Sequence, residues 1–247
     1  MNQKDKLVFK YKMQVISQCP TCSAKNDFVI GCQNKCFEKV EKGRNYINAG
    51  IPTKYFDLAL EVFNDYTKKS KSVDLMNKRN NIYKATKDFL DNLELNLNFG
   101  KGFLFFGNFG TGKSTLSMNI AKACVDLGKT INVREFSEMV KIAQSGYEIG
   151  GETEIDIFQE FLNCDAYFIE NLDWVYQKNN SDYVSMFLDN LVSLAFKYDI
   201  SLFITSNMSD KDIKNNFNEH IYSLLHENCQ MFDVPGDDIR LKKTIKK

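Results

Sequence analysis

The fold of this chain is decided by the stretch Gly107-Asn108-Phe109-Gly110-Thr111-Gly112-Lys113-Ser114. It fits the pattern G-x-x-x-x-G-K-[ST], the phosphate-binding loop known as the P-loop. An apolar run at 103–106 precedes it, and apolar side chains follow at helical spacing, at Leu116, Ile120, Cys124 and Leu127. A glycine-rich turn between a strand and a helix directs backbone N–H groups and the positive end of the helix dipole at phosphates. The motif and its flanks therefore predict a nucleotide site.

The motif assigns a role to each part of this loop. Residues 107–115, which include Thr115, are expected to surround the phosphates of ATP. Lys113 would reach the β- and γ-phosphates, and the hydroxyl of Ser114 would ligate Mg²⁺. The alternative is an ordinary glycine turn before a helix, and the matching strand and helix on either side make it the weaker interpretation.

The composition excludes several classes of protein. The 247 residues suffice for one full domain plus a small module, and 43% apolar content supports a sizeable core. The formal net charge is zero, so nucleic acid would have to be held by a local patch. No apolar run approaches the roughly 18 residues that span a bilayer, and the N-terminus lacks the apolar region of a secretory signal. These features predict a cytoplasmic protein that does not contact a membrane.

Strand-like and helical patterns alternate after the P-loop. Short apolar runs predict further strands at 131–133, 166–169, 202–205 and 230–233. Helices are predicted at 54–66, 137–144 and 153–162, with later helices capped by Ser181 and by the pair Ser209 and Asp212. A polar connector is expected at 67–72. Such alternation predicts an α/β fold in which helices cover both faces of a parallel sheet.

Polar residues follow two of the predicted strands. Glu170 ends the third strand and would replace the usual acid that holds the Mg²⁺ shell of a P-loop enzyme. Asn171 follows it, and an amide can orient a water molecule but cannot take its proton. Asn207 follows the fourth strand and could contact the γ-phosphate or its water. Lys113, Glu170 and Asn207 are thus the predicted catalytic residues; a plain strand end for Glu170 and a turn for Asn207 are the alternatives.

A cysteine pattern marks the N-terminal segment. The spacing is C-x₂-C, nine residues, then C-x₃-C, at Cys19, Cys22, Cys32 and Cys36. Four thiolates suit tetrahedral Zn²⁺, and the lysine-rich surroundings offer little core in which free thiols could be buried. The sequence therefore predicts a zinc-binding module at 1–45, whose partner is left open between protein and nucleic acid, and an ATP-binding domain at 46–247.

The chain resembles the DnaC/DnaI/IstB group of AAA+ ATPases, which includes replicative helicase loaders and transposition accessory ATPases. The similarity lies in the P-loop segment and in segments 49–55, 203–208, 220–229 and 236–242. It implies a P-loop AAA+ sheet, ATP with Mg²⁺ as cofactors, a polar sensor at Asn207 and self-association through the ATPase domain.

The chain also departs from that group. Its members usually carry two acids after the third strand, where this chain has Glu170 and Asn171, and arginines in the segment that here reads His220 and Leu224. One of those arginines acts on ATP held by the next subunit, and such an arginine is worth about 10³–10⁵ in rate. Weak or partner-dependent ATP hydrolysis is therefore expected. Arg240 is a candidate for a remaining γ-phosphate sensor.

The resemblance implies an ATP-binding helicase loader or replication accessory protein that engages a replicative DNA helicase and single-stranded DNA. The richness in Lys, Asn, Phe and Ile favours a phage or other mobile element as the source. Two alternatives stay open: an IstB-like transposition accessory ATPase, and an adaptor that binds nucleotide without hydrolysing it. A small-molecule kinase is disfavoured, because the few arginines form no cluster typical of a lid.

Overall fold

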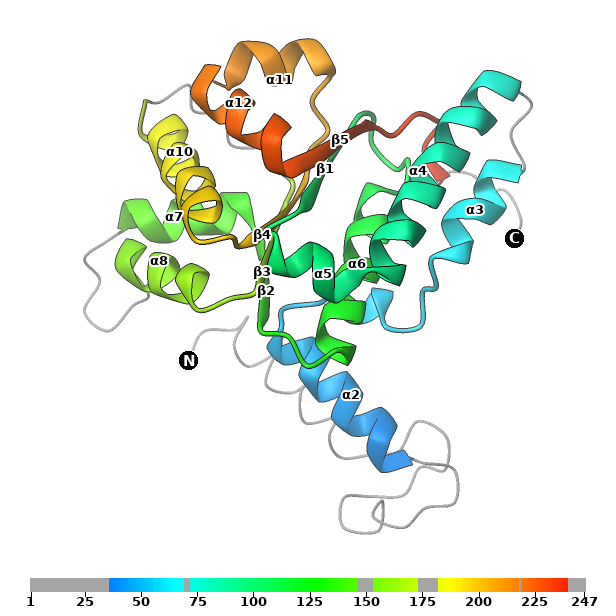
Figure 1. Cartoon of the computed structure of the whole chain (residues 1–247), viewed down its shortest axis with the longest axis horizontal. Helices are drawn as coiled ribbons and strands as arrows, with labels where there is room; N and C mark the ends of the chain where they lie inside the picture. Colours follow the sequence, from blue (N-terminus) through cyan, green and yellow to red (C-terminus); the bar gives the residue numbers. More distant parts are fainter. Residues whose placement is uncertain (1–35, 69–71, 146–152, 173–181, 218, 240–247) are drawn as a thin grey trace. The chain divides into compact units, whose positions relative to one another are not determined.

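The computed structural model describes residues 36–68, 72–145, 153–172, 182–217 and 219–239. The chain divides into two compact units, Met1–Asp57 and Leu58–Lys247. The described part of the first unit holds helix α2 (Cys36–Asn48) and the short 3-10 helix η2 (Thr53–Tyr55) (Figure 1). The other cysteines of the predicted zinc module, and the side chain of Cys36, lie outside the described residues. The zinc module and its boundary at residue 45 stay predictions.

The second unit is built on a parallel sheet. Its strands are β1 (Gly102–Phe106), β2 (Ile131–Glu135), β3 (Ala166–Glu170), β4 (Ser201–Thr205) and β5 (Cys229–Asp233). Their order is β2-β3-β4-β1-β5, and every neighbouring pair is parallel. The three central strands are buried along their whole length, as expected for a sheet covered on both faces. The predicted α/β fold is confirmed.

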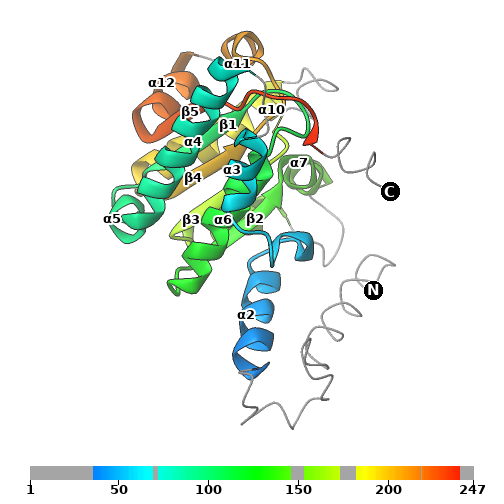
Figure 2. The same ribbon diagram turned by 90° about the vertical axis from the view of Figure 1, so that its right-hand side faces the viewer.

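Two layers of helices cover this sheet (Figures 1 and 2). One layer holds α3 (Glu61–Lys68), α4 (Val73–Asp91), α5 (Leu93–Asn98) and α6 (Lys113–Asp126). The other holds α7 (Phe136–Ser145), α8 (Glu154–Leu162), α10 (Asp182–Lys197), α11 (Asp210–Asn216) and α12 (Glu219–Asn228). No helix in the described ranges is both long and apolar enough to cross a membrane.

The sheet has a different core on each face, because successive side chains of a strand point to opposite sides. The face toward α4 carries phenylalanine rings: Phe203 stacks on Phe168 at 4.5 Å, and Phe89 of α4 lies 4.8 Å from Phe103. The other face carries mostly aliphatic side chains, such as Leu104 and Ile204, which join the core beneath α7, α10 and α12. Both faces exclude water, so polar groups of the sheet gather at the strand ends.

One helix prediction was wrong at its boundaries. The helix expected at 54–66 is instead the η2 turn followed by α3, which begins only at Glu61 and continues to Lys68. The carbonyl of Leu58 accepts a hydrogen bond from Lys122 Nζ at 2.6 Å, so it does not bond within a helix. The capping box of Ser209 and Asp212 is confirmed.

Candidate nucleotide-binding site

The P-loop lies between β1 and α6 and depends on its glycines. Gly110 and Gly112 have φ angles of 70° and 105°, values that side chains rarely allow. A Cβ atom on Gly110 would lie 1.9 Å from Asp238 Oδ1, and one on Gly112 would lie 2.9 Å from the ring of Phe63. Glycine is therefore required at both positions for conformation and for space; Gly112 is a fixed position of the motif, and Gly110 is one of its variable positions.

Lys113 is held inside the loop. Its side chain is buried, and Nζ donates to the carbonyl oxygens of Gly107 at 2.7 Å and Asn108 at 2.6 Å. The charge is thus fixed within the turn that the motif assigns to phosphates. The loop tip is open, because the Asn108 and Phe109 side chains are exposed.

The start of α6 supplies further donors. Gly112 occupies the N-cap position in a left-handed conformation, and it offers no side chain to cap the helix. The N–H groups of the first turn of an α-helix have no acceptor within the helix, and the helix dipole adds positive potential there. Ser114 and Thr115 lie half-buried in this turn. The predicted phosphate contacts therefore converge on one side of the loop.

Glu170 ends β3 in a water-excluded position. Burial raises the pKa of its carboxyl group, and the nearby hydroxyls of Ser114, Ser117 and Thr205 oppose that rise. Its Oε1 atom and Ser117 Oγ are buried without a hydrogen-bond partner of normal geometry among the described residues. A buried carboxylate oxygen without a partner is costly unless a cation or donor satisfies it. An oxygen donor of this kind, close to the Ser114 hydroxyl, fits Mg²⁺.

The end of β4 brings the predicted catalytic residues to one edge of the sheet. Ser206 N donates to Phe105 O at 2.9 Å, and Gly107 N donates to Met208 O at 3.2 Å. On the other side, Leu172 N donates to Thr205 O at 3.0 Å. Half-buried Asn207 therefore lies in a segment that is bonded to both the P-loop strand and the end of β3.

The positions that depart from the resemblance have structural roles. Asn171 has a φ of 57°, a left-handed conformation that asparagine tolerates better than most residues. His220 Nδ1 lies 2.9 Å from Asp189 Oδ1 on the molecular surface. Leu224 packs partly buried against the core beneath α10 and α12. None of these three side chains is itself a carboxylate or a guanidinium.

Arg79 and the segment after β5 also contact the P-loop, and the sequence analysis missed both. Arg79 Nη1 donates to Thr111 O at 2.9 Å, and Ile239 N donates to Gly110 O at 3.0 Å. One signal could have revealed the arginine. It shares the apolar face of α4 with Ile82 and Phe89, where a charged residue needs an explanation. Arg240, the candidate sensor, lies outside the described residues.

Comparisons with known proteins bear on the fold. No protein-family model matches the chain, and the search of curated proteins gave no match. Among solved structures, the DnaC helicase loader is similar, with 18% identity and a TM-score of 0.56, over 74% of this chain and 100% of that one. DnaI is similar with 13% identity and a TM-score of 0.54, over 76% of this chain and 93% of that one.

A third similar structure is the replication initiator DnaA bound to AMPPCP and single-stranded DNA. It shares 13% identity and a TM-score of 0.57, over 79% of this chain and 55% of DnaA. The described chain has a DnaC-like AAA+ fold.

Proposed function

We propose that this protein is an ATP-binding helicase loader or replication accessory protein. The carrying observation is that the P-loop and the buried, unpartnered Oε1 of Glu170 meet at one edge of the sheet, with Ser114 between them. An ordinary glycine turn would not need a buried carboxylate beside it. The arrangement therefore favours a nucleotide polyphosphate with a divalent cation.

The residues of this edge receive distinct roles. Lys113 and the loop of residues 107–115 surround the phosphates, through N–H groups other than those of Gly107 and Thr115, which have backbone acceptors. Ser114 with Glu170 would hold Mg²⁺. When bound, Mg²⁺ would neutralise part of the phosphate charge. Asn207 orients the γ-phosphate or a water molecule. Asn171 cannot accept a proton, so this chain alone hydrolyses ATP slowly.

The proposal of a helicase loader is supported by the similar fold and by the share of the similar structures that this chain covers. The chain spans the whole of the DnaC helicase loader structure and most of DnaI. The DnaA structure of the same fold holds a nucleotide analogue and single-stranded DNA. We extend these relations to a replicative DNA helicase and single-stranded DNA as partners, and to self-association through the ATPase domain.

The N-terminal module completes the proposal. Cys19, Cys22, Cys32 and Cys36 would bind one Zn²⁺, and the module would contact the helicase or a nucleic-acid strand. Metal analysis of the purified protein tests this directly. One zinc per chain is expected, and a Cys19→Ser, Cys22→Ser double variant should lose it; a metal-free wild-type protein purified without chelator would contradict it.

A second function, that of an adaptor which binds nucleotide without turnover, is favoured by a specific observation. The three positions at which hydrolytic groups are missing are each explained by a local structural role, in Asn171, His220 and Leu224. An IstB-like partner of a transposase would use the same fold. Turnover with and without single-stranded DNA and helicase separates a slow ATPase from an adaptor.

The experiment that tests the leading proposal has two stages. Titration of a fluorescent ATP analogue should show saturable, Mg²⁺-dependent binding, and Lys113→Ala should abolish it. Light scattering on mixtures with the host's replicative helicase should then show a defined complex that responds to ATP. Absence of nucleotide binding would end the proposal; nucleotide binding without a helicase complex would direct the search to a transposase.

A further inference from the structure

Arg79 is a buried cation in the layer of helices that contains the P-loop helix. Its side chain is only 2% exposed. Nε donates to Thr67 Oγ1 at 3.0 Å, and Nη1 donates to Thr111 O and Pro235 O, each at 2.9 Å. Its guanidinium carbon lies 4.0 Å from the ring centroid of Phe63. One side chain thus joins α3, the P-loop and the segment after β5.

The charge of Arg79 is not balanced by a carboxylate in the described chain. Its acceptors are backbone carbonyls and one hydroxyl, and it forms no ion pair with any residue in the described ranges. Burial lowers its pKa to about 10, and no carboxylate contributes to that shift. A buried charge is normally paired with an opposite one. The charge of this arginine is therefore left to be balanced by an anion beyond the described chain.

The contact with Thr111 also sets the direction of a peptide group. The C=O and N–H of a trans peptide point in opposite directions. Because Thr111 O is bonded to Arg79, the N–H of Gly112 points away from the guanidinium. Ile239 N fixes the preceding peptide in the same manner through Gly110 O. Two successive peptide planes of the loop are therefore set by groups outside it.

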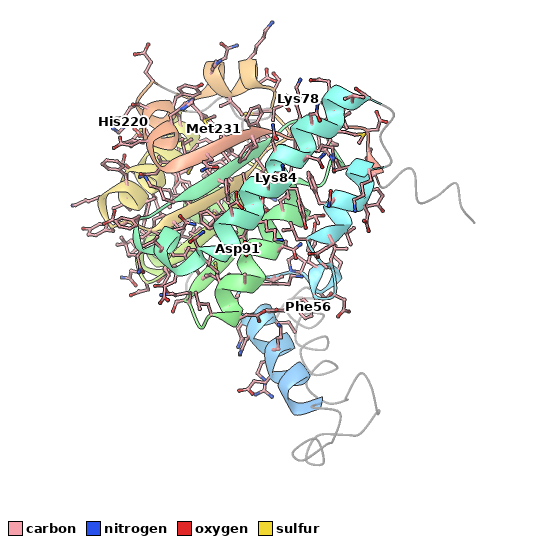
Figure 3. All side chains as sticks on the ribbon, turned by 45° about the vertical axis from the view of Figure 1, so that its right-hand side comes forward. Phe56, Lys78, Lys84, Asp91, His220 and Met231 are labelled. Atoms are coloured by element: carbon pink, nitrogen blue, oxygen red, sulfur yellow. The ribbon has the colours of Figure 1, made fainter. Side chains whose placement is uncertain are left out.

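The space around the guanidinium admits little rearrangement. A Cβ atom on Gly236 would lie 3.3 Å from Arg79 Nη1, and a Cβ atom on Gly112 would lie 2.9 Å from Phe63. The neighbouring residue Lys78 is exposed and forms an ion pair with Asp74 at 3.0 Å. Figure 3 shows Lys78 and Lys84 along α4. Lys78 is therefore a matched control for a change of charge on the same helix.

We propose that Arg79 is a positioning residue for nucleotide polyphosphates: it aims the Gly112 N–H at the phosphates, and their negative charge balances its own. This inference rests on the proposed nucleotide binding and adds to it a residue outside the motif. The ligand class follows from the chemistry, because both effects grow with the number of phosphates. Adenine and ribose play no part in it.

Binding of ATP, ADP, AMP and inorganic tripolyphosphate by the full chain tests the proposal. Arg79→Gln should weaken ATP and tripolyphosphate binding by about 10–100-fold, the range for loss of a charge-assisted contact. AMP binding should change less than about threefold, which corresponds to an energy difference well below that of one such contact. Arg79→Lys keeps the charge but loses the planar set of N–H donors of the guanidinium. Its ATP affinity should therefore lie between those of wild type and Arg79→Gln. Lys78→Gln should bind every ligand as wild type does.

Several outcomes overturn the inference. A folded Arg79→Gln protein that binds ATP like wild type, or that loses ATP and AMP binding equally, would reduce Arg79 to a packing role. If Arg79→Gln does not fold by circular dichroism, Arg79→Lys decides, and unchanged ATP affinity there rejects the positioning role. Failure of wild type to bind any of the four ligands would instead reject the proposed function itself.

Discussion

The P-loop and the positions that depart from the resemblance differ in how far they match the expected site. In the P-loop, the motif glycines have positive φ angles, Lys113 is held within the loop, and Gly112 lies at the start of α6. After β3 and on α12, the carboxylate and guanidinium that the resemblance leads us to expect are replaced by Asn171, His220 and Leu224. From this contrast we expect that nucleotide binding and hydrolysis place separate demands on this fold. A chain can retain the first while its hydrolytic groups diverge.

Of the substitutions proposed, Lys113→Ala should have the largest effect, which is a loss of ATP affinity. Truncating one partner of a buried, hydrogen-bonded charge pair costs about 2–5 kcal/mol. ATP binding should fall by that amount in isothermal titration, while the fold persists by circular dichroism. Lys101→Ala, a change at an exposed lysine just before β1, is the control. Retained ATP affinity in Lys113→Ala would place the phosphates elsewhere.

Glu170→Gln should increase the free energy of unfolding but abolish Mg²⁺-dependent ATP turnover. Burial raises the pKa of Glu170, so the folded protein holds a proton that the unfolded chain releases above about pH 4.3. The free energy of unfolding should therefore decrease as pH rises from there to the raised pKa, and then level off. Without nucleotide, the glutamine variant should be more stable at neutral pH by about 1–3 kcal/mol, the usual penalty of an unsatisfied buried group.

Thermal unfolding between pH 4 and pH 8 measures this effect. The variant should lack the pH-dependent loss seen in wild type, and it should lose Mg²⁺-dependent ATP turnover. Asp91→Asn, which changes an exposed carboxylate at the end of α4, controls for the charge change. A Glu170→Gln protein less stable than wild type would mean that the carboxylate is satisfied in the folded state.

Asn171→Asp tests whether a carboxylate at this position restores ATP hydrolysis. Aspartate also tolerates the left-handed conformation that Asn171 adopts, whereas the longer glutamate is less suited to it. A positioned general base contributes 10²–10⁴-fold, so an imperfectly placed one should raise turnover by at least about tenfold. Steady-state phosphate release measures it. Unchanged turnover with intact ATP binding would show that the missing arginine, and not the missing acid, limits the rate.

His220→Ala should have the smallest effect. The imidazole is exposed and pairs with Asp189 at the surface, where such pairs contribute about 0.2–1 kcal/mol. Unfolding by urea should shift by no more than this, with ATP affinity unchanged. A large loss of turnover in this variant would assign His220 a role in trans that its contacts do not indicate.

The strand pattern and the P-loop could be predicted from the sequence because both are local. The apolar run at 103–106 and the glycines that follow it determine the conformation of their own backbone. Each predicted strand lies within a strand of the structure. The structure around Leu58 could not be predicted, because Lys122, which takes its carbonyl, lies 64 residues away. The φ of Asn171 could not be predicted either, because its backbone N–H donates to Thr205 Oγ1, which lies 34 residues along the chain.

Arg79 marks the limit of sequence-based prediction at the site. Its position on an apolar helix face signals that something unusual is buried, but its acceptors lie 32 and 156 residues along the chain. Only the folded arrangement shows that these acceptors meet at the P-loop. The motif therefore predicts which residues contact phosphate, and the structure adds what holds those residues in place.

The bridge from Thr111 through Arg79 to Pro235 has a consequence for how the protein matures. The guanidinium comes from a helix before the P-loop, and Pro235 comes from the last described segment of the second unit. A chain still being synthesised can form the glycine turn, but it lacks the end that steadies it. If the chain binds ATP as proposed, we therefore expect a copy truncated before Pro235 to bind it more weakly than a copy that contains this segment.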